Sequence, residues 1–283
     1  MIDQKFNAVA GIDVPRPGQR TSLMSPAVSA ARGPINEFLE WFGDLGIFLW
    51  YVVGAAVTPP FEFRELFRQL DEIGSKSLPL VALAGAATGI VLSLQARFSL
   101  TRFGAKSLLP AAIVFSIIRE TGPIITGLVV SGRVGAGIGA ELATMKVTEQ
   151  IDAIEASAVN PYRLLAATRI LACILVLPFL TLAADFCGVF MGWVAQAMVE
   201  PLSLHQFINS GFKGSHFNDF LPPTFKTAVF GLIIGLIACF QGMRTQGGAE
   251  GVGRAATSSV VLSSLFVILA DVVLVKFIII FFP

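Results

Sequence analysis

Long apolar runs with few charges dominate the chain from residue 77 to its end. A helix needs about 20 consecutive apolar residues to cross the hydrocarbon core of a bilayer. Five runs approach or exceed that length. The sequence therefore predicts five membrane-spanning helices, at residues 77–96, 107–132, 170–199, 227–243 and 255–282.

The segment 35–57 is ambiguous. It has acidic residues near its start and aromatic residues along its length, and two prolines follow it. Aromatic residues at this density suit the headgroup region, so a helix lying in the membrane interface fits as well as a sixth span does. If this helix does not cross, the distribution of lysine and arginine favours a cytoplasmic N-terminus. Residues 1–33 are polar and rich in proline, which predicts a flexible cytoplasmic tail.

Composition supports a membrane protein. Apolar residues make up 54% of the 283 residues and charged residues 14%, whereas a globular protein has about 25% charged residues. The net charge of +1 argues against a nucleic-acid partner, which would call for a clustered basic surface.

No motif indicates catalysis, a metal site or a disulfide. Cys173, Cys187 and Cys239 lie far apart in apolar runs and are interpreted as small core residues. His205 and His216 have no matching ligands near them in the sequence. There is no Ser/His/Asp arrangement, HExxH motif or pair of carboxylates suited to acid–base chemistry, so we expect a protein that is not an enzyme.

Arg119 and Glu120 stand in the middle of the second predicted span. A charge at the centre of a bilayer costs about 2.5–3.5 kcal/mol on insertion scales. Neighbouring residues on a helix point about 100° apart, so at least one of the two must face another helix, a polar ligand or water. The alternatives are an ion pair that joins two helices and a functional site. Residues 121–123 (Thr-Gly-Pro) follow at once and are expected to loosen the backbone hydrogen bonding.

Two other intramembrane charges are weaker candidates for a function. Lys226 opens the fourth span and could extend its ammonium group to the interface, which is the common role of a lysine at a span end. Asp271 lies within the fifth span.

Four glycines stand at and after the end of the second span, namely Gly132, Gly135, Gly137 and Gly139, and the last three have GxGxG spacing. A nucleotide-binding loop is excluded, because no strand precedes them and no Gly-Lys-Ser/Thr follows. Small residues at this spacing favour close approach of two membrane helices.

A short amphipathic helix is predicted between the second and third spans, over residues 148–158. Thr148 is expected to cap it, with Glu149 and Asp152 in its first turn. Asn160-Pro161 should end it, because the residue before proline avoids the α conformation.

One face of this helix is apolar and another is acidic. The apolar residues are Val147, Ile151, Ile154 and Ala158, and the acidic ones are Glu149, Asp152 and Glu155. A helix lying on the bilayer usually carries lysine and arginine, and the inner leaflet is negatively charged. The acidic face therefore favours docking on a protein partner over lying on the membrane.

Several of these stretches together resemble the MlaE/YrbE permease family. The matching residues are 119–123, 131–136 and 141–153, then Pro161 and Arg169, and a second signature at 251–257. The resemblance covers about residues 35–283 and leaves the N-terminal tail unmatched.

The resemblance implies the permease subunit of an ABC-type phospholipid transporter in the bacterial inner membrane. Family members are homodimers in which an interfacial helix precedes five membrane helices, so the segment 35–57 would not cross. A cytoplasmic ATPase binds and hydrolyses ATP, and this chain would bind no cofactor of its own. A periplasmic MCE-domain protein relays phospholipid between the two membranes. The coupling helix that docks on the ATPase would contain Thr148, Glu149, Ile151, Asp152, Ile154 and Glu155.

The resemblance also implies a substrate site. In the family, an Arg-Glu pair in the second span and a lysine opening the fourth lie near the lipid headgroup, and Arg119, Glu120 and Lys226 match these positions. Phe103 stands where some members have a tyrosine, and it lacks the hydroxyl group that could make a polar contact.

Two other classes of function stay open on the residues alone. An ion- or proton-coupled secondary carrier could use Arg119, Glu120 and Asp271 as a relay, although such carriers usually show internal repeats and the sequence has none that we recognise. A membrane scaffold that transports nothing would explain the acidic helix but not the intramembrane charges. Co-purification with an ATPase would separate the permease from both.

Overall fold

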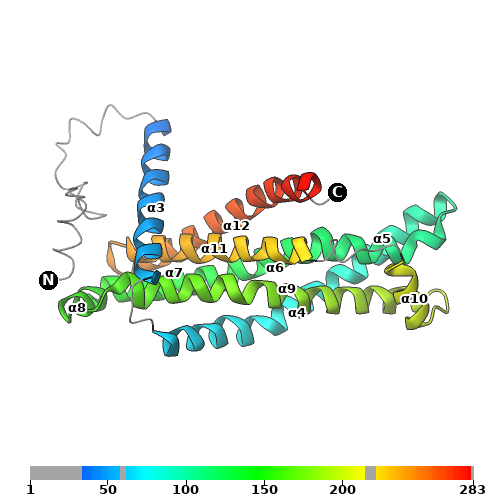
Figure 1. Ribbon diagram of the computed structural model, residues 1–283, viewed down its shortest axis with the longest axis horizontal. Coiled ribbons are helices and arrows are strands. Elements are labelled where there is room, and N and C mark those ends of the chain that lie inside the picture. The colour runs from blue at the N-terminus through cyan, green and yellow to red at the C-terminus, as the bar shows by residue number, and fades with distance from the viewer. Residues whose placement is uncertain (1–33, 58–61, 214–220, 282–283) are drawn as a thin grey trace. The chain divides into compact units, whose positions relative to one another are not determined.

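The computed structural model describes residues 34–57, 62–213 and 221–281, and nearly all of these residues are helical, with no strand among them (Figure 1). The all-α prediction is therefore confirmed, while the predicted tail at 1–33 lies outside the described residues. In chain order the elements are α3 (Pro34–Val57), α4 (Phe63–Arg102), η1 (Lys106–Leu108), α5 (Leu109–Ser116), η2 (Ile117–Thr121), α6 (Gly122–Val130), η3 (Ser131–Gly135), α7 (Ala136–Val147), α8 (Gln150–Ala156), η4 (Tyr162–Ala167), α9 (Thr168–Ala197), α10 (Leu204–Gly211), α11 (Leu221–Met243) and α12 (Gly248–Phe281).

Six helical segments of the described chain are long and apolar enough to cross a membrane. They are Leu39–Ala56, Phe63–Arg102, Lys106–Val147, Tyr162–Ala197, Leu221–Met243 and Gly248–Phe281. The chain is an all-α, multi-pass integral membrane protein. Each of the five predicted spans overlaps one of the last five segments. The first segment, within α3, has the length to cross as well, and its assignment to the membrane interface stays a prediction.

The helices extend well beyond the apolar runs that predicted them. α4 begins at Phe63 rather than near residue 77. Its first turns are charged, and they are supported by pairs on the helix surface, Arg68 with Glu65 and Lys76 with Glu72, each 2.7 Å long. An apolar run predicts the part of a helix that lies in lipid. It does not predict where the helix begins, because charged turns can precede the run, as they do in α4.

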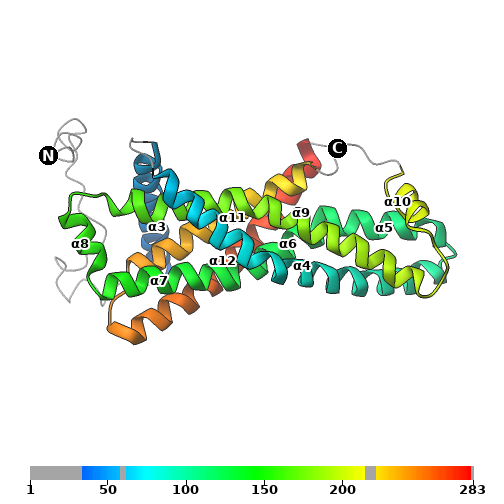
Figure 2. The ribbon, with the colours of Figure 1, turned by 90° about the horizontal axis from the view of Figure 1, so that it is seen from below.

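Glycines allow α4 and α9 to pack very closely (Figure 2). A Cβ atom added at Gly85 would overlap the backbone of Ala184, and one at Gly89 would overlap the carbonyl oxygen of Gly188. Without a hydrophobic driving force between helices in lipid, such close backbone contact is a main source of association. The α4–α9 pair is therefore a closely packed part of the bundle.

The predicted packing role of the GxGxG stretch is confirmed at one of its glycines, Gly139. Gly139 faces the side chain of Ser259 on α12, which leaves no room for a Cβ atom. A Cβ atom at Gly135 would lie 3.8 Å from the side chains of Ile234 and Ser263, an ordinary contact that does not require glycine. At Gly132 and Gly137 a Cβ atom would meet nothing within 4 Å among the described residues.

Three π-helical turns interrupt the long helices in the described chain: η2 and η3 within the segment that runs from α5 to α7, and η4 at the start of α9. A π turn shifts the backbone pairing by one residue, and such turns occur frequently at functional sites. η2 contains both Arg119 and Glu120.

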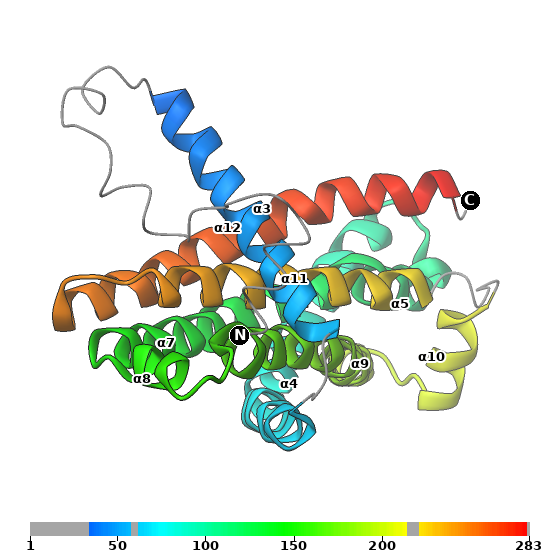
Figure 3. The same cartoon turned by 60° about the vertical axis from the view of Figure 1, so that its left-hand side comes forward.

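The remaining connections are short. α8 forms the turn between α7 and η4, and α10 follows α9 (Figure 1). Ser203 and Gln206 form a capping box at the start of α10, while Phe207 on this helix packs against α5. α11 and α12 follow one another after a short connection and pack against each other (Figure 3), and the buried residues of α12 end at Asp271.

Candidate functional site

The backbone of η2 presents an unusual acceptor. In an α-helix the carbonyl of Arg119 would accept a hydrogen bond from the amide of residue 123, but that residue is Pro123, which has no N–H group. The carbonyl instead accepts from the ammonium group of Lys226 on α11, over 3.0 Å. The expected loosening of the backbone after Glu120 therefore creates a specific contact to another helix.

Lys226 is the centre of a polar cluster that joins three helical segments. Besides the carbonyl of Arg119, its Nζ lies 3.1 Å from Oε2 of Glu120 and 2.9 Å from Oδ1 of Asp271 on α12. Its side chain is only 1% exposed. The alternative in which Lys226 extends its ammonium group to the interface is wrong, because the side chain is buried and its ammonium group lies against three oxygen atoms.

The structure brings Asp271 into this cluster, which sequence reasoning named only as a weak candidate. Asp271 is buried, and it supplies a second carboxylate to the ammonium group of Lys226. An acidic residue in an apolar span marked Asp271 as a candidate. Because Asp271 lies more than forty residues after Lys226, the sequence gave no reason to pair the two.

Arg119 and Glu120 themselves are exposed in the single chain. The guanidinium of Arg119 lies 5.9 Å from the ring centroid of Phe115, a cation–π distance. Glu120 shares Lys226 with Asp271, yet its side chain remains 49% exposed. The membrane helix thus carries an exposed cation, Arg119, next to an exposed anion, Glu120. The buried Lys226 binds the backbone of the turn that bears them.

A second buried acid lies beside the same turn. Asp185 on α9 is 6% exposed, and its Oδ1 has no hydrogen-bond partner among the described residues. The carboxylate occupies the space where a Cβ atom of Gly122 would be. Only glycine fits at position 122, which is the first residue after η2.

Phe103 is not part of this arrangement. It lies at the C-terminal end of α4 and is 83% exposed. No hydrogen bond, ion pair or ring contact within the described residues joins it to the Lys226 cluster. Its role in the substrate site stays a prediction.

The predicted amphipathic helix is present, with different ends. α8 covers Gln150–Ala156 rather than 148–158. Thr148 does not cap it: its hydroxyl donates to the carbonyl of Thr144, 2.8 Å away, and so completes α7. Glu149 then takes a left-handed backbone conformation with φ of 59°. The chain turns too sharply between the two helices for Thr148 to begin the second.

The two faces of α8 agree with their prediction. Ile151 is buried and Ile154 is half-buried, whereas Glu149, Asp152 and Glu155 are exposed. Asp152 also pairs with Lys146 on α7, 2.8 Å away. Ala158 has a positive φ of 61° and lies beyond the helix, so it does not belong to the apolar face.

The turn between α9 and α10 carries a small exposed charge cluster. Glu200 pairs with Lys106 at 2.9 Å and with Arg97 at 2.7 Å. The hydrogen bond from Lys106 and the charge of Arg97 hold the pKa of the Glu200 carboxyl below its usual range.

The two histidines form no metal site that the structure describes. His205 meets Asn209 through its ring nitrogen, 2.9 Å away, and His216 lies outside the described residues. No group of three or more histidine, cysteine, aspartate or glutamate side chains in the described part of the chain could hold a metal ion.

Comparison with known proteins identifies the family. The family model described as Permease MlaE matches residues 66–277. The chain belongs to the MlaE permease family. The match includes η2 with Arg119 and Glu120, the α8 turn, and both partners of the Lys226–Asp271 pair.

Similar proteins occur in organisms as distant from one another as Rickettsia and Arabidopsis thaliana. A probable ABC transporter permease protein of Rickettsia typhi is 37% identical over 235 residues, covering 83% of this chain and 91% of the relative. One from Synechocystis is 33% identical over 208 residues, covering 74% and 79%. The chloroplastic protein TRIGALACTOSYLDIACYLGLYCEROL 1 of Arabidopsis thaliana is 34% identical over 238 residues, covering 84% and 68%.

This MlaE-family chain is thus an ABC transporter permease, a transport subunit whose designation implies a partner ATPase.

Proposed function

We propose that this chain is the permease subunit of an ATP-driven phospholipid transporter, which moves lipid between the bacterial inner membrane and a periplasmic MCE-domain protein. Two copies of the chain form the membrane part, with the N-terminus in the cytoplasm. ATP is bound and hydrolysed by a separate cytoplasmic subunit that docks on α8.

The observation that carries the lipid assignment is the exposed Arg119–Glu120 pair on η2. A phospholipid headgroup carries a phosphate, and zwitterionic headgroups add a cationic group. A guanidinium group binds phosphate through paired hydrogen bonds, and a carboxylate suits the cation. Charges exposed in the middle of a membrane helix are costly unless they meet water or a polar ligand.

Two further observations support this proposal. The name of the Arabidopsis relative refers to a diacylglycerol glycolipid, which favours a lipid as the substrate class of this chain. The acidic face of α8, with its buried Ile151, has the form of a helix that docks on a protein rather than on an anionic membrane surface.

Photo-crosslinking tests the lipid site directly. Arg119→Ala and Glu120→Ala should assemble with the ATPase in normal yield but lose most crosslinking to a photoactivatable phospholipid, and most lipid transport in reconstituted vesicles. Arg64→Ala is the matched control, since Arg64 is an exposed arginine on the charged start of α4. Full crosslinking and transport by Arg119→Ala would refute the site.

The same vesicles separate the alternative functions. A secondary carrier would transport without its ATPase and respond to an ion gradient, with Glu120 and Asp271 as the acids of a relay. A scaffold would assemble with its partners and transport nothing under either condition.

A further inference from the structure

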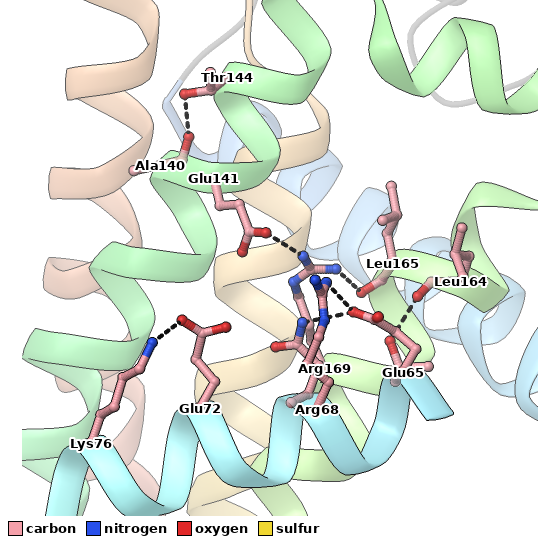
Figure 4. A network of polar contacts seen from close by, with 12 residues as sticks. Glu65, Arg68, Glu72, Lys76, Ala140, Glu141, Thr144, Leu164, Leu165 and Arg169 are labelled. Atoms are coloured by element: carbon pink, nitrogen blue, oxygen red, sulfur yellow. Dashed lines mark hydrogen bonds and ion pairs between the residues drawn. The ribbon is translucent and has the colours of Figure 1, made fainter. Parts of the chain in front are cut away.

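A buried guanidinium group links α7 and α9 at the base of the α8 turn (Figure 4). Arg169 is 1% exposed, and its Nη2 donates to Oε1 of Glu141 on α7 over 2.8 Å. Its Nη1 donates to the carbonyl of Leu165, inside η4, over 3.0 Å. One side chain therefore ties α7 to the π turn that opens α9.

This ion pair is poorly explained by stability alone. Burying an arginine is costly, and an ion pair with a partly buried partner returns that cost only where geometry and hydrogen bonding are good. Glu141 is 48% exposed, and the buried Nε of Arg169 has no hydrogen-bond partner among the described residues. Apolar side chains would fill the same place without these costs, so the pair is better understood through what it positions.

The pair connects two helices that share α11 as a packing partner but differ in the other main one. α7 packs chiefly against α11 and α12, whereas α9 packs chiefly against α4 and α11. Glu141 comes shortly before α8 in the chain and Arg169 shortly after it. The ion pair consequently closes the segment that carries α8 into a loop with a fixed base.

The same end of the bundle holds a second charged pair. Glu65 on α4 accepts hydrogen bonds from Arg68 over 2.7 Å and from Gln69 over 2.9 Å. Figure 4 shows these side chains next to Arg169, so three helices meet around this group of charges. Glu72 and Lys76 form an exposed pair one turn further along α4.

A continuous helical path leads from this clamp to the candidate lipid site. α7 continues back through η3 and α6 into η2, which bears Arg119. Both π turns on this route are tied to another element by a polar side chain, η2 by Lys226 and η3 by the contact of Arg133 with Ser77. π turns are places where a helix can bend, so ties at these turns decide which bends are allowed.

We propose that Glu141 and Arg169 act as a positioning clamp, which makes α7, α8 and the start of α9 move as one body when the ATPase displaces α8. With the clamp in place, the displacement reaches η2 along α7. Without it, the α8 loop opens at its base and absorbs the motion. The inference rests on the proposed docking of an ATPase on α8, and neither residue is expected to touch the lipid.

The test follows the exposed position Ser116, directly before η2, in the complete complex with its ATPase. In a cysteine-free background, Ser116→Cys reports the state of η2 through its labelling rate, with and without ATP. We expect ATP to change this rate in the parent complex. Glu141→Gln, which keeps the size and one acceptor oxygen, should retain ATP hydrolysis but reduce the ATP-dependent change about fivefold or more, the lower range of allosteric coupling.

Glu72→Gln is the matched control, because it neutralises a carboxylate of an exposed ion pair at the same end of the bundle. It should leave the ATP-dependent labelling as in the parent. A Glu141→Gln complex that labels like the parent would overturn the clamp, and so would a parent complex in which ATP does not alter the labelling of Ser116→Cys at all. A purely structural role would lower the yield of complex without reducing its ATP-dependent labelling change.

Lipid transfer measured on the same preparations keeps the two proposals distinct. If ATP changes labelling in the parent and Glu141→Gln abolishes that change, the clamp stands, even where the parent moves no phospholipid. A parent complex that moves no phospholipid would refute the phospholipid assignment and leave the clamp standing. If the parent does transport phospholipid, Glu141→Gln should lower the number of lipids moved per ATP in parallel with the labelling change.

Discussion

The ammonium group of Lys226 donates to the carbonyl oxygen of Arg119, the one carbonyl of η2 that Pro123 deprives of its α-helical donor. A proline in one helix and a lysine in another thus act together on one backbone atom. The contact fixes the turn that displays the side chains of Arg119 and Glu120. It also explains why a charged lysine is tolerated in the interior of the bundle.

Removing this lysine should destabilise the fold, because the carboxylate of Asp271 would stay buried without its cation. We expect Lys226→Met to lower the free energy of unfolding by about 3–5 kcal/mol, the usual cost of breaking a buried ion pair. The double variant Lys226→Met/Asp271→Leu should recover part of that loss, since it leaves no unpaired Asp271 carboxylate. Thermal unfolding of the purified protein in detergent measures both. Equal stability of the single and double variants would show that Asp271 does not depend on Lys226.

Because α4 packs closely on α9, replacing Gly89 with a larger residue should destabilise the protein. Gly89→Val places atoms where the carbonyl oxygen of Gly188 lies, and overpacking of this kind costs about 1–3 kcal/mol or more. Gly137→Val is the control at a position where a Cβ atom meets nothing within 4 Å. The yield of monodisperse protein should fall sharply for the first variant and stay near that of the parent for the second. Similar yields would mean that the α4–α9 contact is looser than described.

Charge reversal on α8 should detach the ATPase and leave the membrane part intact. Glu149→Lys, Asp152→Lys and Glu155→Lys, combined, invert the exposed face while Ile151 keeps its buried place. A tagged permease should then recover much less ATPase in a pull-down. Undiminished recovery would count heavily against docking through this face. Part of the effect could come from Lys146, which loses its partner, so Lys146→Ala alone serves as the control.

Cysteine labelling can decide whether α3 crosses the membrane. With an interfacial α3, the two ends of the chain lie on opposite sides. In a background without Cys173, Cys187 and Cys239, an impermeant reagent added outside should label a cysteine placed after Pro283 but not one placed at Ser25. Labelling at both positions would mean that α3 spans the bilayer. A lysed sample, in which both positions react, controls for access.

Much of the fold could be predicted because lipid imposes simple demands. Every backbone polar group must be satisfied within the segment itself, so a charge-free run of sufficient length has to be helical. The same logic marked Arg119 and Glu120, since charges in such a run are costly. Sequence reasoning failed at Thr148, whose capping role depends on the angle between α7 and α8. That angle is set by packing and by the left-handed backbone at Glu149, neither of which has a local signature.

The sequence by itself determined that this is a helical membrane protein, which intramembrane residues are charged, and that an acidic amphipathic helix connects two of its spans. These properties follow from composition and period, which are local. The tertiary structure alone decided which charges meet: that Lys226 turns inward to Glu120 and Asp271, and that Arg169 joins Glu141. Partners far apart in the chain are paired by how helices cross, and the crossing depends on where glycines such as Gly89 let backbones touch.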